Sequence, residues 1–172
     1  MTVSLILGGA RSGKSQRAEA LAEASGFPVI YVATAPKIEG DEEWTQRIIH
    51  HQQRRSSDWK TMEEELGLVD LISAQAETGK VLFVDCLTLW LSNLMYHGRD
   101  MDVEVKQLCE MLTTIQCDVI LVSNEVGMGL VPETPEGRVF RDAQGRLNQA
   151  VAAVADTVEF VVAGLPMRLK GE

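Results

Sequence analysis

The sequence predicts an α/β fold in which a mostly parallel, doubly wound sheet carries helices on both faces. Two observations support this prediction. Short apolar runs alternate with longer helical stretches along nearly all of the 172 residues, which is the pattern of repeated strand–helix units. Some of these runs are apolar at every position, as expected for strands that are buried on both faces. The length suits a single domain, residues 1–172, with one core.

The first strand is expected at residues 3–7 and runs directly into the segment GGARSGKS, which opens a helix expected at 14–24. The segment matches the phosphate-loop pattern G-x-x-x-x-G-K-[ST] at a strand-to-helix junction, where the pattern is informative. Glycines allow a tight turn with inward N–H groups, and the helix adds the positive end of its dipole. The alternative is a chance glycine-rich turn beside a lysine. The predicted triphosphate site consists of Gly8, Gly9, Ala10, Arg11, Ser12, Gly13, Lys14 and Ser15.

Two residues of this loop have expected roles in catalysis. Lys14 is expected to reach the β- and γ-phosphates, and Ser15 to offer its hydroxyl to Mg²⁺.

A strand at 29–33 and a helix across 42–55 are expected next. On that helix, positive charge gathers around His50 and His51, from Arg47, Arg54 and Arg55. Guanidinium groups bind phosphate oxygens and disfavour a protonated imidazole. The pattern therefore makes His51 a candidate nucleophile toward the α-phosphorus of a nucleoside triphosphate. On the residues alone, a solvated charged face with a packed or surface histidine is the plainer alternative.

A further helix is expected at 66–78, followed by a buried strand at 81–85. This strand ends in Asp85, so the fold places a carboxylate at the edge of the sheet beside the phosphate loop. There it is expected to hold Mg²⁺, directly or through water. A helix cap is the alternative role for Asp85.

The rest of the chain is expected to form helices at 87–95, 103–115 and 142–155 and strands at 119–123 and 158–163. The loop that follows strand 119–123 contains two glycines and Glu125, a candidate for a substrate or metal contact. Arg138, Arg141 and the segment 145–149 are either anion contacts or ordinary caps near a helix start, and spacing does not decide between them.

Composition excludes several classes of protein. The formal net charge of −9 disfavours nucleic acid as a partner, because such binding needs a basic surface. We find no apolar run long enough to span a membrane and no signal-peptide pattern, so a cytoplasmic protein is expected. The three cysteines lack a metal-ligand spacing, and we expect neither zinc nor disulfides.

Six motifs in fixed order resemble a known family. They lie at residues 8–15, 31–35, 47–63 (R-I-x-x-H-x-x-x-R-x-x-x-W-x-T-x-E), 85–88, 124–129 and 145–149. Together they resemble the bifunctional adenosylcobinamide kinase / adenosylcobinamide-phosphate guanylyltransferase of cobalamin biosynthesis.

The resemblance implies a RecA-like phosphate-loop fold and a homotrimer with active sites near the subunit boundaries. It also implies two reactions. Adenosylcobinamide is phosphorylated by a nucleoside triphosphate, ATP or GTP, with Mg²⁺. GMP is then transferred from GTP to adenosylcobinamide phosphate through a guanylylated histidine, and pyrophosphate is released.

Carried over by position, the resemblance makes His51 the guanylylated histidine, because the spacing to Arg55 and Trp59 starts from the second histidine of the pair. The pair Gln52–Gln53 departs from the more basic pair that relatives commonly carry. A simple small-molecule kinase without guanylyl transfer remains the alternative, and a non-catalytic nucleotide-binding module or strand-handling ATPase is a third. The positions implied around GTP are Ala33, Thr34, Ala35, Gln52, Gln53, Arg54, Arg55, Glu63 and Asp85.

Overall fold

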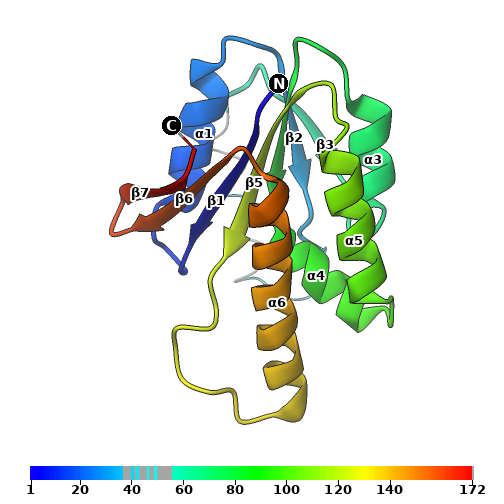
Figure 1. Ribbon diagram of the computed structural model, residues 1–172, viewed down its shortest axis with the longest axis vertical. Helices are drawn as coiled ribbons and strands as arrows, with labels where there is room; N and C mark the ends of the chain where they lie inside the picture. The colour runs from blue at the N-terminus through cyan, green and yellow to red at the C-terminus, as the bar shows by residue number, and fades with distance from the viewer. Residues whose placement is uncertain (37–39, 41, 43–45, 47–48, 50–55, 172) are drawn as a thin grey trace.

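The computed structural model describes residues 1–36, 40, 42, 46, 49 and 56–171. Within this part of the chain, seven strands form one sheet in the order β3-β2-β4-β5-β1-β6-β7 (Figure 1). Neighbouring strands are parallel except for the antiparallel pair β6 and β7. The strands are β1 (Val3–Gly8), β2 (Val29–Ala33), β3 (Lys60–Glu63), β4 (Val81–Asp85), β5 (Asp118–Asn124), β6 (Thr157–Val162) and β7 (Leu165–Lys170).

Helices cover both faces of the sheet, as predicted. Helix α1 packs with one cluster of buried strand residues, and α3, α4, α5 and α6 pack with the cluster on the opposite face. The helix bounds are α1 (Lys14–Ala24), α3 (Leu68–Gln75), α4 (Leu87–Tyr96), α5 (Met101–Leu112) and α6 (Pro135–Val154).

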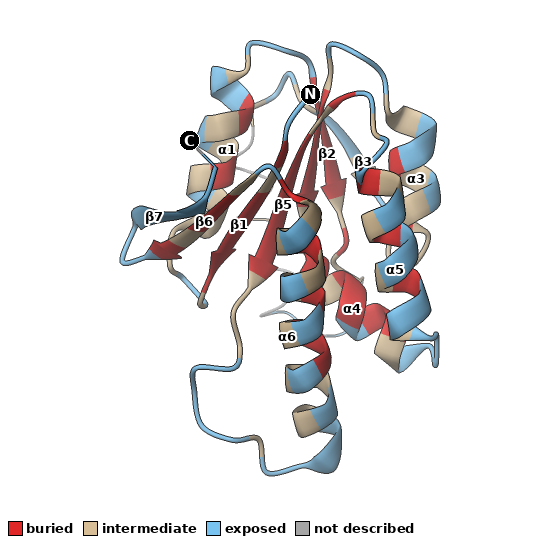
Figure 2. Ribbon diagram, viewed as in Figure 1, coloured by how far each residue is buried: buried red, intermediate tan, exposed pale blue. Residues whose placement is uncertain are grey.

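Successive side chains of the central strands belong alternately to the two halves of the core, one on each face of the sheet. In β4, Leu82 and Val84 belong to the cluster under α3 to α6, whereas Val81 and Phe83 belong to the cluster under α1. All four are fully buried, because parallel strands covered on both faces exclude water from every side chain. Figure 2 shows this burial along the middle of the sheet.

Strand β3, strand β7 and the start of α6 differ from the sequence-based prediction. Strands β3 and β7 were not predicted, because they are edge strands that are mostly or entirely exposed and carry no buried apolar run. Helix α6 begins at Pro135, not near residue 142, because Thr134 caps it by accepting a hydrogen bond from Gly137 N at 3.1 Å. The predicted helix across 42–55 lies almost wholly outside the described residues.

Candidate active site

The phosphate loop joins the end of β1 to the start of α1. The residue before the helix, Gly13, has φ of +96° and offers no side chain to cap the helix. The first turn contains Lys14 and Arg17 but no acidic residue, so nothing in it neutralises the positive end of the helix dipole. The free N–H groups and this dipole make the loop suitable for binding an anion.

Gly8 is required by the close packing of the loop. A Cβ atom built there would lie 2.4 Å from Ser12 Oγ and 2.7 Å from the carbonyl oxygen of Val161. Such distances are well inside van der Waals contact, so any other residue at this position displaces the loop or β6. The Ser12 hydroxyl is itself buried and has no hydrogen-bond partner among the described residues.

Lys14 points its amine back across the loop. Its Nζ atom donates a hydrogen bond to the carbonyl oxygen of Gly9 at 3.1 Å. Burial lowers the pKa of Lys14 below its ordinary value of 10.5, and the negative charge of the nearby Asp85 opposes that shift. Among the described residues no carboxylate lies within salt-bridge distance of Nζ. This ammonium group is therefore available to a phosphate.

Asp85 ends β4 on the same side of the sheet as the phosphate loop. Side chains alternate along a strand, and Phe83, two residues earlier, packs in the cluster under α1. The hydroxyl of Tyr31 donates a hydrogen bond to Asp85 Oδ2 at 3.0 Å. The N-cap of α4 is Cys86, which makes no side-chain capping bond, and Asp85 makes none either. The alternative role of Asp85 as a helix cap is therefore wrong.

Cys86 follows Asp85 but is not a reactive thiol. Burial raises its pKa to about 12, with a smaller contribution from the neighbouring Asp85. A thiol must lose its proton to act as a nucleophile. Cys86 therefore stays protonated beside the site and serves as a packing residue.

The segment Ala33, Thr34 and Ala35 leaves the end of β2 next to Asp85. Thr34 is fully buried, and its hydroxyl donates to the carbonyl oxygen of Cys86 at 2.7 Å and accepts from Cys86 N at 2.9 Å. The side chain of Thr34 therefore holds the ends of β2 and β4 together. Glu63, exposed at the end of β3, is the register partner of Ala33, so the two lie at one edge of the sheet.

Hydrogen bonds to residues of α4 and α6 fix the end of β5. Asn124 N donates to the hydroxyl of Thr88 at 2.8 Å, and its carbonyl oxygen accepts from Asn148 Nδ2 at 3.0 Å. Asn124 is the register partner of Gly8, and its Oδ1 atom is buried without a partner among the described residues. The structural roles of Thr88 and Asn148 were not predicted, although both lie in sequence motifs, since only the fold brings these residues together.

Glu125 is engaged within its own turn. Its carboxylate accepts hydrogen bonds from Gly127 N at 2.7 Å and Met128 N at 3.1 Å, and its main-chain N donates to Gly8 O at 3.1 Å. These contacts order the loop after β5 beside the phosphate loop. They give Glu125 a structural role, and its candidacy as a substrate or metal contact stays a prediction.

His51, Gln52, Gln53, Arg54 and Arg55 lie outside the described residues. Their predicted roles remain predictions.

Comparison with known proteins identifies the family. The family model for cobinamide kinase / cobinamide phosphate guanyltransferase matches residues 4–169. The chain belongs to this family. It is 49% identical to the bifunctional adenosylcobalamin biosynthesis protein CobP of Pseudomonas aeruginosa over 170 residues, 98% of this chain and 97% of that protein. It is 39% identical to the bifunctional adenosylcobalamin biosynthesis protein CobU of Escherichia coli, covering 96% and 98% of the two chains.

Solved structures of distant proteins share the fold. One is a protein of Pyrococcus horikoshii with a TM-score of 0.56 at 8% identity, covering 99% of this chain and 86% of that one. Another is the ATPase EscN of enteropathogenic E. coli, with a TM-score of 0.54 at 11% identity, covering 94% of this chain and 43% of that one. The third, the P4 protein of bacteriophage phi6 in complex with ADP, has a TM-score of 0.51 at 15% identity over 96% and 54%. The predicted RecA-like fold is confirmed.

The residues beside the phosphate loop suit a magnesium ion whose remaining coordination positions are filled by substrate phosphates and water. Mg²⁺ is usually held by one or two carboxylates together with substrate phosphates and water. Asp85 offers a carboxylate on the side of the phosphate loop, and Ser15 offers a hydroxyl in the first turn of α1. In the described parts of the chain no three His, Cys, Asp or Glu side chains gather into a metal cage. The described residues therefore do not form a metal site from side chains alone.

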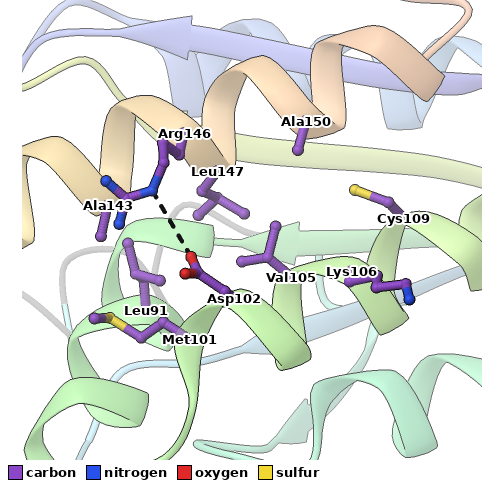
Figure 3. Close-up of a pocket in the computed structure, with 10 residues that line it drawn as sticks. All are labelled: Leu91, Met101, Asp102, Val105, Lys106, Cys109, Ala143, Arg146, Leu147 and Ala150. Atoms are coloured by element: carbon purple, nitrogen blue, oxygen red, sulfur yellow. Dashed lines mark ion pairs between the residues drawn. The ribbon is translucent and has the colours of Figure 1, made fainter.

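Arg146 lies away from the phosphate loop. It lines a cavity of about 330 Å³ between α5 and α6 on the face opposite α1, among apolar side chains such as Val105 and Leu147 (Figure 3). Its Nε atom lies 3.7 Å from Asp102 Oδ1. Arg138 donates instead to the carbonyl oxygens of Pro132 and Glu133. Both arginines, which the sequence left open as anion contacts, have partners within the chain.

No helix in the described ranges is long and apolar enough to cross a membrane.

Proposed function

We propose that this chain phosphorylates adenosylcobinamide with a nucleoside triphosphate and then transfers GMP from GTP to the phosphate formed. The observation that carries this proposal is the family match over residues 4–169, together with a phosphate loop at the β1–α1 junction. Both reactions use a triphosphate, and the loop supplies an anion site for it.

In the kinase step, the hydroxyl of the substrate attacks the γ-phosphorus, and the nucleoside diphosphate leaves. Positioning and charge stabilisation provide most of the catalysis in such a transfer. The loop N–H groups hold the phosphates, and Lys14 adds its ammonium at the β- and γ-phosphates. Ser15 and Asp85 would hold Mg²⁺, which would supply further charge neutralisation on these oxygens when bound.

In the guanylyl-transfer step, His51 is the proposed nucleophile. Its imidazole nitrogen attacks the α-phosphorus of GTP, a P–N bond forms, and pyrophosphate leaves. A phosphate oxygen of adenosylcobinamide phosphate then attacks the same phosphorus, and the P–N bond breaks to give adenosylcobinamide-GDP. The covalent intermediate divides one difficult transfer into two easier ones. Arg54 and Arg55, close to His51 in the sequence, are proposed to hold phosphate oxygens.

The remaining finer assignments rest on the family resemblance. We propose that Glu63 and the segment Ala33, Thr34 and Ala35 line the GTP site. Thr34 is fully buried, and its hydroxyl, N–H and carbonyl oxygen are bonded to Cys86, Asp85 and Asn93, so its proposed part is to support this segment. The same proposal includes a homotrimer, a cytoplasmic location and a single domain over residues 1–172.

Labelling with GTP radioactive at the α-phosphate tests the proposal. Wild type and a His50→Ala control are expected to carry covalent, acid-labile label, and His51→Ala is expected to carry none. The kinase step is expected to survive in His51→Ala, because γ-phosphoryl transfer does not use the imidazole. Label that persists in His51→Ala contradicts the assigned nucleophile. An active kinase with no label in wild type supports the simple kinase instead.

A further inference from the structure

The turn of the β6–β7 hairpin lies against the phosphate loop. Its two central residues, Ala163 and Gly164, have φ of +53° and +78°, the backbone that a tight two-residue hairpin turn requires. Gly164 N donates a hydrogen bond to the carbonyl oxygen of Ser12 at 2.8 Å. A Cβ atom built on Gly13 would lie 3.1 Å from Gly164 Cα. The hairpin turn and the phosphate loop are therefore in direct main-chain contact.

This contact fixes the direction of the Gly13 N–H group. The peptide bond between Ser12 and Gly13 is planar and trans, so the Ser12 carbonyl and the Gly13 N–H point in opposite directions. When Gly164 holds the carbonyl oxygen on the hairpin side, the Gly13 N–H is turned to the other side. That N–H has no acceptor within the described part of the chain, as expected for a donor reserved for a ligand.

An ion cluster around the buried carboxylate of Glu159 holds the hairpin in place on α1. The carboxylate of Glu159 in β6 accepts from Arg17 Nε at 2.7 Å and Arg17 Nη2 at 2.9 Å. It also accepts from Arg168 Nη2 in β7 at 2.9 Å. The side chain of Glu159 is 4% exposed. Both strands of the hairpin are thereby tied to the helix that follows the phosphate loop, so the turn cannot move far from Ser12 without breaking charged hydrogen bonds.

We propose that Gly164 is a positioning residue for the triphosphate: its N–H holds the Ser12 carbonyl and so directs the Gly13 N–H at the bound phosphate. The role of this residue rests on the proposed function, since it requires that the loop binds a triphosphate. It assigns a part in nucleotide binding to the C-terminal hairpin, outside all six sequence motifs.

The test compares Gly164→Ala with Gly79→Ala. Gly79 has a nearly equal φ of +81°, and at both positions a Cβ atom would meet nothing within 4 Å. Both substitutions strain a left-handed residue, but Gly79 precedes β4 at the opposite end of the sheet. Both variants are expected to lose similar thermal stability. Only Gly164→Ala is expected to raise the Kd of GTP and the KM for the nucleotide in the kinase assay, because relief of the strained φ moves the retained N–H away from Ser12. The upper limit is about fivefold, which corresponds to complete loss of that hydrogen bond.

A backbone ester at residue 164 removes the N–H without a new side chain. Residue 164 is close to the C-terminus, so semisynthesis can introduce the ester. It is expected to raise the Kd of GTP by the same factor, with the KM for adenosylcobinamide unchanged. An ester chain that binds GTP within twofold of wild type overturns the positioning role. Failure of the wild-type chain to bind GTP contradicts the proposed function instead.

Discussion

Replacement of Glu159 by glutamine removes the charge that joins α1 to the β6–β7 hairpin. The variant loses three charge-assisted hydrogen bonds, two from Arg17 and one from Arg168. Breaking a fully buried pair costs about 3–5 kcal/mol. Arg17 and Arg168 are 30% and 42% exposed, so water partly solvates them after the loss. We therefore expect the free energy of unfolding to fall by about 2 kcal/mol, or about 4–8 °C in Tm.

The stability lost in Glu159→Gln is expected to depend on pH. Hydrogen bonds from Arg17 are the main reason that the pKa of Glu159 lies below its ordinary value of 4.5. A carboxyl group with a lowered pKa contributes its full stabilisation above the unfolded value and loses it as the pH falls through the folded value. The difference in stability between wild type and Glu159→Gln is therefore expected to be constant from neutral pH to about 5. It is expected to shrink in more acidic solution.

Urea denaturation followed by circular dichroism, repeated across this pH range, measures the difference. Glu104→Gln is the matched control, because Glu104 is also nearly buried but contacts Arg99, which is 53% exposed. We expect the control to lose less than about 1 kcal/mol. A Glu159→Gln variant as stable as wild type at pH 7 refutes the reasoning. So does a difference that stays the same in acid.

Three further substitutions test the phosphate loop and the strand ends around it. Lys14→Met is expected to raise the Kd of GTP about 10–100-fold, because a charged hydrogen bond to phosphate is lost; calorimetric titration measures this, and unchanged affinity contradicts the assignment. Gly8→Ala is expected to cost about 1–3 kcal/mol of stability in denaturation, with partial recovery when Ser12→Ala removes the nearer clash. Thr34→Val is expected to lose about 1–3 kcal/mol, because the buried Cys86 N–H loses its partner and the Cys86 carbonyl oxygen keeps only Trp90 N, whereas Thr34→Ser stays near wild type. Equal stability of the two Thr34 variants would exclude the hydroxyl as the bridge.

The central strands and the phosphate loop were predictable because their signals are local. Residues 81–85 form an apolar run ending in a carboxylate, and β4 occupies these positions. The phosphate-loop pattern itself specifies the positions of the glycines and the lysine, and α1 begins at Lys14 as expected. Edge strand β7 has no such signal, because its side chains are exposed and β6 is its one strand partner in the described part of the chain.

The sequence by itself determined the α/β class, the family and the position of the phosphate loop, since periodicity and motif spacing are properties of neighbouring residues. Only the tertiary structure decided that Thr34 bridges two strand ends, that Glu125 caps its own turn, and that Gly164 touches the phosphate loop. Arg17 and Glu159 are 142 residues apart in the chain. Contacts of this kind form only when the chain folds and brings distant segments together, so no local pattern encodes them.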